Sequence, residues 1–309
     1  MTKFATIAAA LLAASVAAQA QVPPDIAEKT RALGQTMNPA EGYSPWDGRF
    51  DPAFWDGMSI ERGIAYGEDP AQVLDVYRPG DTRTAPRPVL LFVHGGGFVG
   101  GSRSGNPYPD NVLGWAVKEG MIGVSIDYRL APDHPWPAAA EDLSGALRWV
   151  RDNIARHGGD PNRIVLFGHS AGANHVADYV AHGEVQGGEV FSLKGAILLS
   201  PAYALDQPAE DAEHPYYNTE PAMQWADVVI DGLGKTHVPL FLGIAEFDPD
   251  AMRNFGERAR DWLCQKPESC PEFADLADHN HFTEGLSLGT EDRSLAEPLL
   301  AWMKLNRVF

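Results

Sequence analysis

Ser170 is the first candidate for chemistry in this chain, because it lies in the sequence Gly-His-Ser-Ala-Gly at residues 168–172. This segment follows a short apolar run and precedes residues with helical periodicity, so the serine is expected at a sharp strand-to-helix turn. Small residues relieve crowding at such a turn, and the backbone N–H group after the serine faces the same space. A free hydroxyl is a poor nucleophile near neutral pH, so a base and a group that orients the base are also needed.

A second segment argues against the simpler interpretation, a chance match in a glycine-rich turn. Residues 94–98 read His-Gly-Gly-Gly-Phe and follow another apolar run. Consecutive glycines let backbone N–H groups approach a developing negative oxygen without interference from side chains. We therefore predict an oxyanion hole. Its expected donors are Gly96, Gly97 and Ala171, with Gly95 as a near competitor, and the alternative is a merely flexible glycine loop.

Several residues compete for the acid and the base. Three carboxylates follow the apolar run near residue 240: Glu246, Asp248 and Asp250. Two histidines come later, at His279 and His281. A neutral imidazole can take the serine proton, and a carboxylate can hold the imidazole tautomer and stabilise the imidazolium. A metal site that uses both histidines and Asp278 is the weaker alternative, because further ligands at suitable spacing are missing.

The elements that must position these residues have the pattern of a parallel sheet with crossover helices. From Gln72 onward, short apolar runs alternate with stretches of helical periodicity. The predicted strands are Val73–Tyr77, Val89–Val93, Ile122–Asp127, Ile164–Phe167, Ala196–Leu199, Leu240–Ile244 and Phe273–Leu276. A helix with apolar residues from Leu143 to Ile154 is expected to end at Gly158 and Gly159, where a left-handed cap needs glycine. The sequence therefore predicts an α/β fold with helices on both faces of the sheet.

Three motifs, in this order and spacing, resemble the hormone-sensitive-lipase-like carboxylesterases of the α/β-hydrolase superfamily. They are residues 94–98, Tyr128–Pro132 and residues 168–172, and the resemblance extends over roughly residues 72–200. It implies an α/β-hydrolase fold with a lid or cap and a triad in the chain order Ser, Asp, His. Downstream, Glu246–Pro249 and His279–Phe282 look more like the related feruloyl-esterase and kynurenine-formamidase branches.

The resemblance selects among the open candidates. Asp248 aligns with the acid of the resembling families and lies just past the end of a predicted strand. The His-Phe turn of these families favours His281 over His279 as the base. His169 is too close in sequence to curl onto Ser170 as a base. The resemblance thus implies a catalytic triad of Ser170, Asp248 and His281.

Two regions outside the predicted sheet are expected to shape the substrate site. One is an irregular arm over residues 21–71 that contributes to a cap, and the other is a lid insertion at about residues 202–231. The catalytic domain is predicted to span residues 72–309. Five side chains are expected to bind substrate: Phe98, His169, Tyr203, Tyr217 and Trp225. The alternative is that the aromatic residues of the lid only pack it onto the core.

Composition limits the classes of partner. The chain has 309 residues, of which 42 are acidic and 24 are Lys or Arg, so its formal net charge is −18 at pH 7. Such a field repels phosphate backbones, and no polybasic stretch overrides it, so we expect neither nucleic acid nor a membrane surface as a partner. A small-molecule ester is the expected ligand. The chemistry requires no metal and no organic cofactor, and the sequence leaves the oligomeric state open.

The first twenty residues have the features of a secretory signal peptide. Lys3 precedes an apolar run rich in Ala and Leu, and the run ends at Ala18-Gln19-Ala20, which resembles a cleavage site. An apolar amino-terminal helix is the alternative. We expect residues 1–20 to be removed, no membrane anchor, and a periplasmic or secreted protein. In an oxidising compartment Cys264 and Cys270 are expected to form a disulfide rather than remain free thiols.

These features together predict an exported serine carboxylesterase. Ser170, deprotonated by His281, attacks an ester carbonyl, the alcohol leaves with the proton, and water then hydrolyses the acyl-enzyme. Two alternatives stay open. The same triad could hydrolyse an amide or carbamate, such as an aryl formamide. A non-catalytic ligand-binding member of the fold is the other, although a binding protein would not need every catalytic position to be filled.

Overall fold

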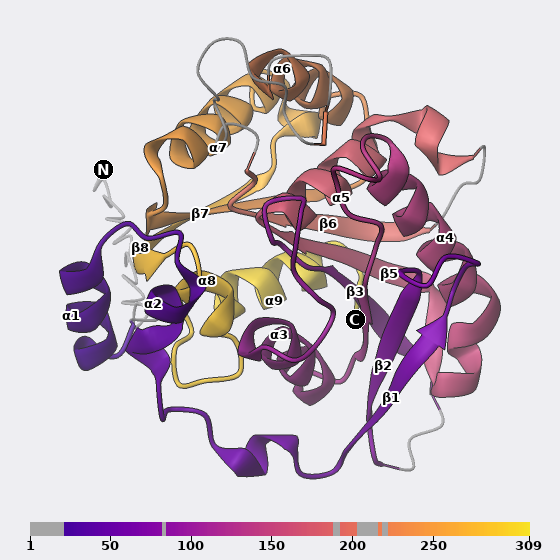
Figure 1. Cartoon of the computed structure of the whole chain (residues 1–309), viewed down its shortest axis with the longest axis horizontal. Coiled ribbons are helices and arrows are strands. Elements are labelled where there is room, and N and C mark those ends of the chain that lie inside the picture. The colour runs from indigo at the N-terminus through magenta and orange to yellow at the C-terminus, as the bar shows by residue number, and fades with distance from the viewer. Residues whose placement is uncertain (1–21, 82–84, 188–191, 203–215, 218–221) are drawn as a thin grey trace, which may run out of the picture.

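The protein is described by a computed structural model that covers residues 22–81, 85–187, 192–202, 216–217 and 222–309 (Figure 1). The predicted signal peptide and Tyr203 lie outside the described residues, so their roles stay predictions. Within the described ranges, an eight-stranded sheet has the order β1-β2-β4-β3-β5-β6-β7-β8. No described helix is long and apolar enough to cross a membrane.

The strands include all seven that the sequence predicts. They are β1 Met58–Ala65, β2 Val73–Pro79, β3 Arg87–Val93, β4 Ile122–Ile126, β5 Gly159–His169, β6 Leu193–Leu199, β7 Leu240–Phe247 and β8 Glu272–Asn280. The pairs β1–β2 and β2–β4 are antiparallel, and the others are parallel. The sequence does not predict strand β1, which belongs to the segment expected to be an irregular arm. It is an edge strand without fully buried residues, so its sequence lacks the apolar run that reveals the other strands.

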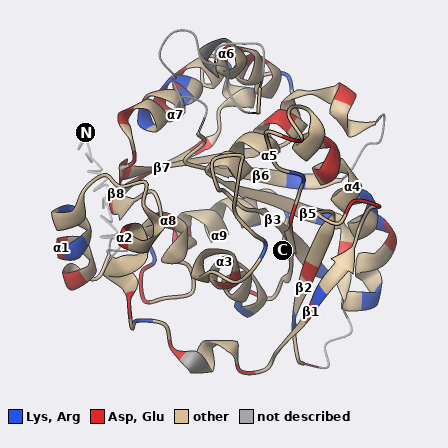
Figure 2. Ribbon diagram, viewed as in Figure 1, with Lys and Arg blue, Asp and Glu red and all other residues tan. Residues whose placement is uncertain are grey.

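Helices cover both faces of the sheet (Figure 1). The α-helices are α1 Pro24–Leu33, α2 Pro39–Tyr43, α3 Pro107–Lys118, α4 Ala138–Asn153, α5 Ala171–Ala181, α6 Ala222–Leu233, α7 Asp250–Leu263, α8 Thr283–Leu286 and α9 Ala296–Leu305. Short 3-10 helices are η1 Ser44–Trp46, η2 Pro52–Trp55, η3 Ile154–His157, η4 Gly183–Gln186 and η5 Pro267–Ser269. Figure 2 shows acidic and basic residues interspersed on α1, α4 and α7, as expected for helices that face solvent.

Apolar side chains of the central strands divide between two cores, one on each face. Leu91 of β3 packs into the core beneath α4, α5 and α6, whereas its neighbours Leu90 and Phe92 pack into the core beneath α3 and α9. Successive side chains of a strand point to opposite faces, and a parallel strand covered on both faces is therefore apolar throughout. This explains why continuous apolar runs, rather than alternating ones, predict these strands correctly.

The predicted helix end and the predicted disulfide are both confirmed. Helix α4 passes into η3, and Gly158 ends this segment with φ 85°, a left-handed conformation that favours glycine. Cys264 and Cys270 form a disulfide that closes the turn after α7.

The predicted lid is described only in part. Residues 222–231 form most of α6, which packs against α5 and α7 as the crossover helix between the parallel strands β6 and β7. Residues 203–215 and 218–221 lie outside the described ranges. A lid over the site therefore stays a prediction for those segments alone.

Candidate active site

The turn between β5 and α5 carries Ser170. This residue has φ 56° and ψ −128°, an uncommon conformation for a residue with a side chain, and its backbone N–H donates to the Leu199 carbonyl of β6 over 2.9 Å. A side-chain carbon at Gly168 would lie 2.4 Å from the Gly172 carbonyl oxygen, and one at Gly172 would lie 2.1 Å from the Val93 carbonyl oxygen. The turn therefore needs glycine on both sides of the serine, in the strained geometry of a nucleophile elbow.

The glycine turn after β3 lies against this serine. A side-chain carbon at Gly95 would lie 2.8 Å from the Ser170 Cβ atom, so the backbone approaches the serine as closely as glycine allows. Gly96 has φ 132°, and a side-chain carbon there would lie 2.1 Å from the Gly100 carbonyl oxygen. Gly97 also has a positive φ, of 61°. The structure thus brings the three glycines to the nucleophile candidate, next to Ala171 at the start of α5.

Tyr128 and His94 fix the start of the glycine turn. The Tyr128 hydroxyl donates to the His94 carbonyl oxygen over 2.7 Å, and the two rings stack with centroids 4.4 Å apart. The Nδ1 atom of His94 lies 2.7 Å from the Gly95 carbonyl oxygen. Burial lowers the pKa of His94, so this imidazole is neutral and orders the loop.

An ion-pair network ties the next part of this loop to the sheet. The Arg103 guanidinium donates to the buried Asp75 carboxylate over 2.8 Å and pairs with Asp127, which follows β4. The Arg103 backbone N–H also donates to Asp127 over 2.6 Å. Arg62 of β1 completes the pairing of Asp75 over 2.8 Å. The glycine turn is therefore anchored at both ends to β2, β3 and β4.

Asp248 and His281 follow the neighbouring parallel strands β7 and β8, and they meet at the same sheet edge as Ser170. The His281 Nδ1 atom lies 2.8 Å from Asp248 Oδ1, and both side chains are buried. The other oxygen, Oδ2, accepts from the Ala245 backbone N–H over 2.7 Å and from the Ser200 hydroxyl. These bonds hold the carboxylate in one orientation toward the imidazole.

The competing residues have other partners. His279 is fully buried, and its Nε2 atom lies 2.8 Å from the Ser294 hydroxyl and 3.2 Å from the Asp292 carboxylate. Glu246 accepts from the Asp278 backbone N–H, and Asp250 accepts from Gln35. Among the predicted acids and bases, the structure therefore pairs Asp248 with His281, as the resemblance implies.

A cavity of about 520 Å³ connects these groups. Its walls include Ser170, His281, His169 and Gly95–Gly97. The amino-terminal arm contributes three further lining residues, Met37, Pro39 and Tyr43. The Tyr43 ring lies edge-on to Phe282, with centroids 5.2 Å apart.

The arm's contribution could not be assigned residue by residue from sequence, because it depends on tertiary docking. Gln35 donates to the Asp248 carbonyl oxygen over 3.0 Å, and Arg31 makes two hydrogen bonds to Asp278. These contacts join α1 and the segment after it to the loop that follows β7 and to the last residues of β8. Ser200 was also missed, although it follows a predicted strand, because Ser is common in loops and no motif surrounds it.

Three of the residues expected to bind substrate do not line this cavity. Phe98 has φ 68° and is buried, and its ring stacks on Tyr216 with centroids 5.3 Å apart. The Tyr217 hydroxyl donates to Asp178 of α5 over 2.9 Å, and the Trp225 indole donates to the same carboxylate over 3.1 Å. Tyr217 and Trp225 thus pack as the alternative for the lid describes, and a role in substrate binding stays a prediction for all three residues. Of the five, His169 alone among the described residues lines the cavity.

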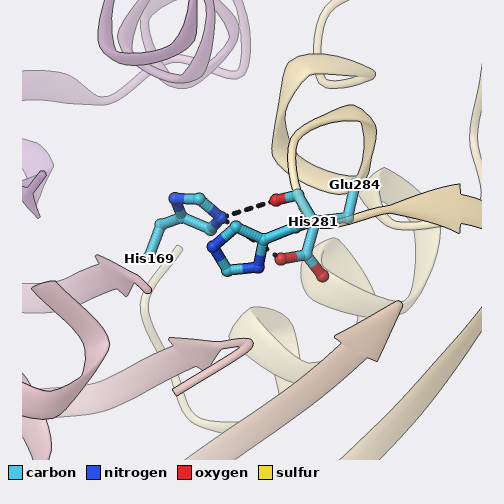
Figure 3. Close-up of side chains that lie close together, drawn as sticks. All are labelled: His169, His281 and Glu284. Carbon is cyan, nitrogen blue, oxygen red and sulfur yellow. Dashed lines mark hydrogen bonds and ion pairs between the residues drawn. The ribbon is translucent and has the colours of Figure 1, made fainter. Parts of the chain in front are cut away.

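His169, His281 and Glu284 form a buried cluster beside the site (Figure 3). One potential metal ligand atom from each lies within 4.8 Å of the other two. The Nε2 atom of His169 lies 2.7 Å from the His281 carbonyl oxygen, however, and the Nδ1 atom of His281 is engaged by Asp248. With both of these nitrogens committed, we interpret the cluster as a hydrogen-bonding arrangement rather than a metal centre.

The fold and the site define a class of protein: an α/β sheet that carries a nucleophile-elbow serine, a facing glycine turn and a buried carboxylate–imidazole pair. The model of the family described as alpha/beta hydrolase fold matches residues 90–249, and the chain belongs to that family. The predicted fold and the resemblance to hormone-sensitive-lipase-like carboxylesterases are thereby confirmed.

Curated relatives match part of the chain. Esterase LipC of Mycobacterium tuberculosis is 47% identical over 113 residues, which cover 37% of this chain and 28% of LipC. Carboxylesterase NlhH of the same species is 49% identical over 88 residues, covering 28% of this chain and 27% of NlhH. The chain thus spans little more than a quarter of the length of these two relatives.

Solved structures match over nearly the whole chain. Esterase Est22 has a TM-score of 0.67 at 17% identity, with 92% of this chain and 98% of Est22 covered. The hyperthermophilic esterase of Pyrobaculum calidifontis has a TM-score of 0.61 at 24% identity, with 92% and 90% covered. At these identities the likeness is one of fold.

Proposed function

We propose that this protein is a serine carboxylesterase that hydrolyses small-molecule carboxylic esters. One observation carries the proposal: an elbow serine, a glycine turn and an imidazole paired with a carboxylate over 2.8 Å line or adjoin the same cavity. Its relatives LipC and NlhH are named as an esterase and a carboxylesterase, which supports this choice of reaction.

The proposed triad is Ser170, His281 and Asp248. Because Asp248 engages Nδ1 of His281, the Nε2 nitrogen is left to accept the serine proton as the oxygen attacks the ester carbonyl. The imidazolium then gives this proton to the leaving alcohol. Water repeats the sequence on the acyl-enzyme, and Asp248 stabilises the imidazolium in both steps without taking its proton.

The oxyanion of each tetrahedral intermediate is proposed to accept hydrogen bonds from the backbone N–H groups of Gly96, Gly97 and Ala171. Such donors act without reorganisation, because the glycine turn is already held by Tyr128 and Arg103. Removal of one oxyanion donor typically lowers kcat by about 10²–10³-fold.

We further propose that the protein is exported and that residues 1–20 are removed. The disulfide between Cys264 and Cys270 supports this, since disulfides persist mainly in oxidising compartments. Mass spectrometry of the protein from periplasmic and culture-medium fractions should find a chain that begins at Gln21. A chain that retains Met1 in the cytoplasmic fraction alone would contradict export.

Ser170→Ala tests the proposed reaction. We expect loss of p-nitrophenyl butyrate hydrolysis and of labelling by a fluorophosphonate probe, with an unchanged circular dichroism spectrum. Ser269→Ala is the matched control, because Ser269 bonds to the Gly234 carbonyl oxygen far along the chain from the elbow. Retained turnover in Ser170→Ala would remove the nucleophile from the proposal. A matched butyramide, measured in parallel, tests the amide alternative.

A further inference from the structure

Glu284 is a buried carboxyl group for which the proposed reaction has no role. It lies in α8, three residues after His281, and is fully buried. Its Oε1 atom lies 3.5 Å from Nε2 of His169, and Figure 3 shows the carboxyl group beside His281 and facing His169. Neither carboxyl oxygen has a hydrogen bond of good geometry among the described residues, and the nearby Ser200 hydroxyl donates to Asp248 instead. Burial of an unpaired polar group is costly, and the cost is much larger when the group is charged. The surroundings of Glu284 therefore decide whether its carboxyl group is protonated or ionised.

The groups around Glu284 supply no positive charge. Titratable and polar groups face Glu284 from each of the elements around α8. They are His169 of β5, Ser200 after β6, Asp248 after β7, His281 after β8 and Tyr108 of α3, and Tyr43 of α2 lies beyond Tyr108. Burial lowers the pKa of His169 well below its usual value, and burial raises the pKa of Tyr108 well above its usual value, so both are neutral. Asp248 is the proposed carboxylate of the triad.

An ionised Glu284 would therefore be an unpaired charge next to a second carboxylate. Burial first, and then the Asp248 charge, raise the pKa of Glu284 well above its usual value. The protonated form is a hydrogen-bond donor as well as an acceptor. Two carboxyl groups held close together in a dry site do not both ionise at neutral pH. With Asp248 ionised, Glu284 therefore keeps its proton.

The tautomer of His169 connects Glu284 to the base. Because Nε2 of His169 lies 2.7 Å from the His281 carbonyl oxygen, that nitrogen carries the proton and donates it. The same N–H group faces Glu284 Oε1 at 3.5 Å. The Glu284 carboxyl group thus contacts the residue that holds the His281 backbone and lies beside the carboxylate that orients the His281 ring.

We propose that Glu284 is a positioning residue of the triad that works as an uncharged carboxylic acid, supporting His169 on one side and the Asp248–His281 pair on the other. This inference rests on the proposed function. In this state Asp248 is the one ionised carboxylate that pairs with His281 among the described residues. A second carboxylate close to the ring would favour the imidazolium over the neutral base. Glu284 acts through its neighbours and does not touch the substrate.

Substitutions that separate shape from charge test this role. Glu284→Gln has the same shape as a protonated glutamic acid and, like it, carries no charge. We therefore expect kcat within about threefold of wild type. We also expect no shift in the acid limb of the pH profile of kcat/KM. Glu284→Leu removes the polar atoms, and we expect a fall in kcat of about tenfold with KM nearly unchanged. A downward shift of the acid limb by a pH unit or more in Glu284→Gln would show that the wild-type group is charged. Wild-type kcat in Glu284→Leu would exclude positioning.

A stability measurement gives a readout that does not depend on catalysis. An acid whose pKa is raised by folding keeps its proton in the folded chain while the unfolded chain loses it, so stability falls as pH rises above the unfolded pKa. Relative to Glu284→Gln, the wild-type unfolding equilibrium constant should therefore rise about tenfold per pH unit above about pH 4.5. If the difference in stability between wild type and Glu284→Gln stays constant from pH 5 to 8, Glu284 is not protonated in the folded protein.

Controls keep this inference separate from the proposed function. Glu119→Gln, at a partly exposed residue after α3, serves as the matched substitution for the unfolding series. The unfolding series can be repeated in Ser170→Ala, where no turnover is needed. If the probe fails to label Ser170 but the pH-dependent stability difference persists, the esterase proposal fails and the neutral state of Glu284 stands. If the probe labels Ser170 and the stability difference between wild type and Glu284→Gln does not change with pH, only the inference about Glu284 fails.

Discussion

His169 donates a hydrogen bond from Nε2 to the main-chain carbonyl oxygen of His281 over 2.7 Å. The residue that precedes the elbow serine thus holds the residue proposed as its base. The two imidazole rings lie with centroids 4.6 Å apart, and the other face of His169 stacks on Tyr108 at 4.3 Å. This contact links the end of β5 to the loop after β8 and sets the separation of nucleophile and base.

Replacement of His169 should therefore weaken catalysis more than substrate binding. His169→Phe keeps a ring against Tyr108 but leaves the His281 carbonyl without its donor. We expect kcat to fall by about tenfold or more, because small misplacements of catalytic groups are expensive. Steady-state kinetics on p-nitrophenyl butyrate measure this split. A variant in which only KM changes would instead make His169 a substrate contact without a positioning role.

Replacement of Asp248 by Asn should reduce turnover far more than it changes structure. The amide keeps the shape, but it cannot stabilise the imidazolium, and its NH2 group favours the wrong His281 tautomer. We expect kcat to fall by about 10³–10⁴-fold. Stopped-flow or long-time assays with the circular dichroism spectrum as a control measure it. Asp250→Asn is the matched variant, and equal losses in both variants would contradict the assignment of the acid.

Much of the architecture could be predicted from the sequence, because buried parallel strands and the elbow glycines leave strong local patterns. The apolar run before Ser170 and the small residues around it specify strand, turn and helix within a few positions. Edge strand β1 has no such pattern, because its side chains are only partly buried. The contacts of Ser200 and Glu284 depend on elements more than 30 residues apart in the chain, and no local spacing reports them.

The aromatic residues around the predicted lid show a different limit. The chemistry of Phe98, Tyr217 and Trp225 and their places in the sequence favour substrate binding, and Tyr217 and Trp225 belong to the predicted lid. Asp178, a buried carboxylate, accepts hydrogen bonds from both Tyr217 and Trp225, whereas the Phe98 ring packs against Tyr216. A polar anchor inside α5 therefore holds Tyr217 and Trp225 against the core, and helical periodicity alone does not reveal it.

Gly96 should tolerate no side chain. A Cβ atom there would lie 2.1 Å from the Gly100 carbonyl oxygen, and φ is 132°. We expect Gly96→Ala to lower kcat/KM by about 10²-fold or more, because the turn must move and an oxyanion donor moves with it. Gly105→Ala is the control, since its φ of 85° imposes a similar backbone strain but no atom lies within 4 Å of the added carbon. Similar losses in both variants would assign the effect to backbone strain alone.

His175 should make the folded protein sensitive to acid. It lies in α5, packed against Phe98, Tyr128 and Tyr216, and neither ring nitrogen has a hydrogen-bond partner among the described residues. Burial lowers the pKa of His175 to about 3, with a smaller contribution from His94. The unfolded chain binds a proton at this residue near pH 6.5, whereas the folded chain does not until about pH 3. Stability is therefore lost as pH falls through this window.

His175→Leu removes the titrating group and keeps an apolar side chain in the core. At pH 7.5 we expect the variant to be less stable than wild type by about 1 kcal/mol, through imperfect packing against the three rings. Between pH 6.5 and 4 its stability should fall less than that of wild type by about 3 kcal/mol, so the order of stability reverses in acid. Urea unfolding at a series of pH values measures this crossing. Parallel stability curves for the two proteins would show that His175 is already hydrated or paired in the folded state.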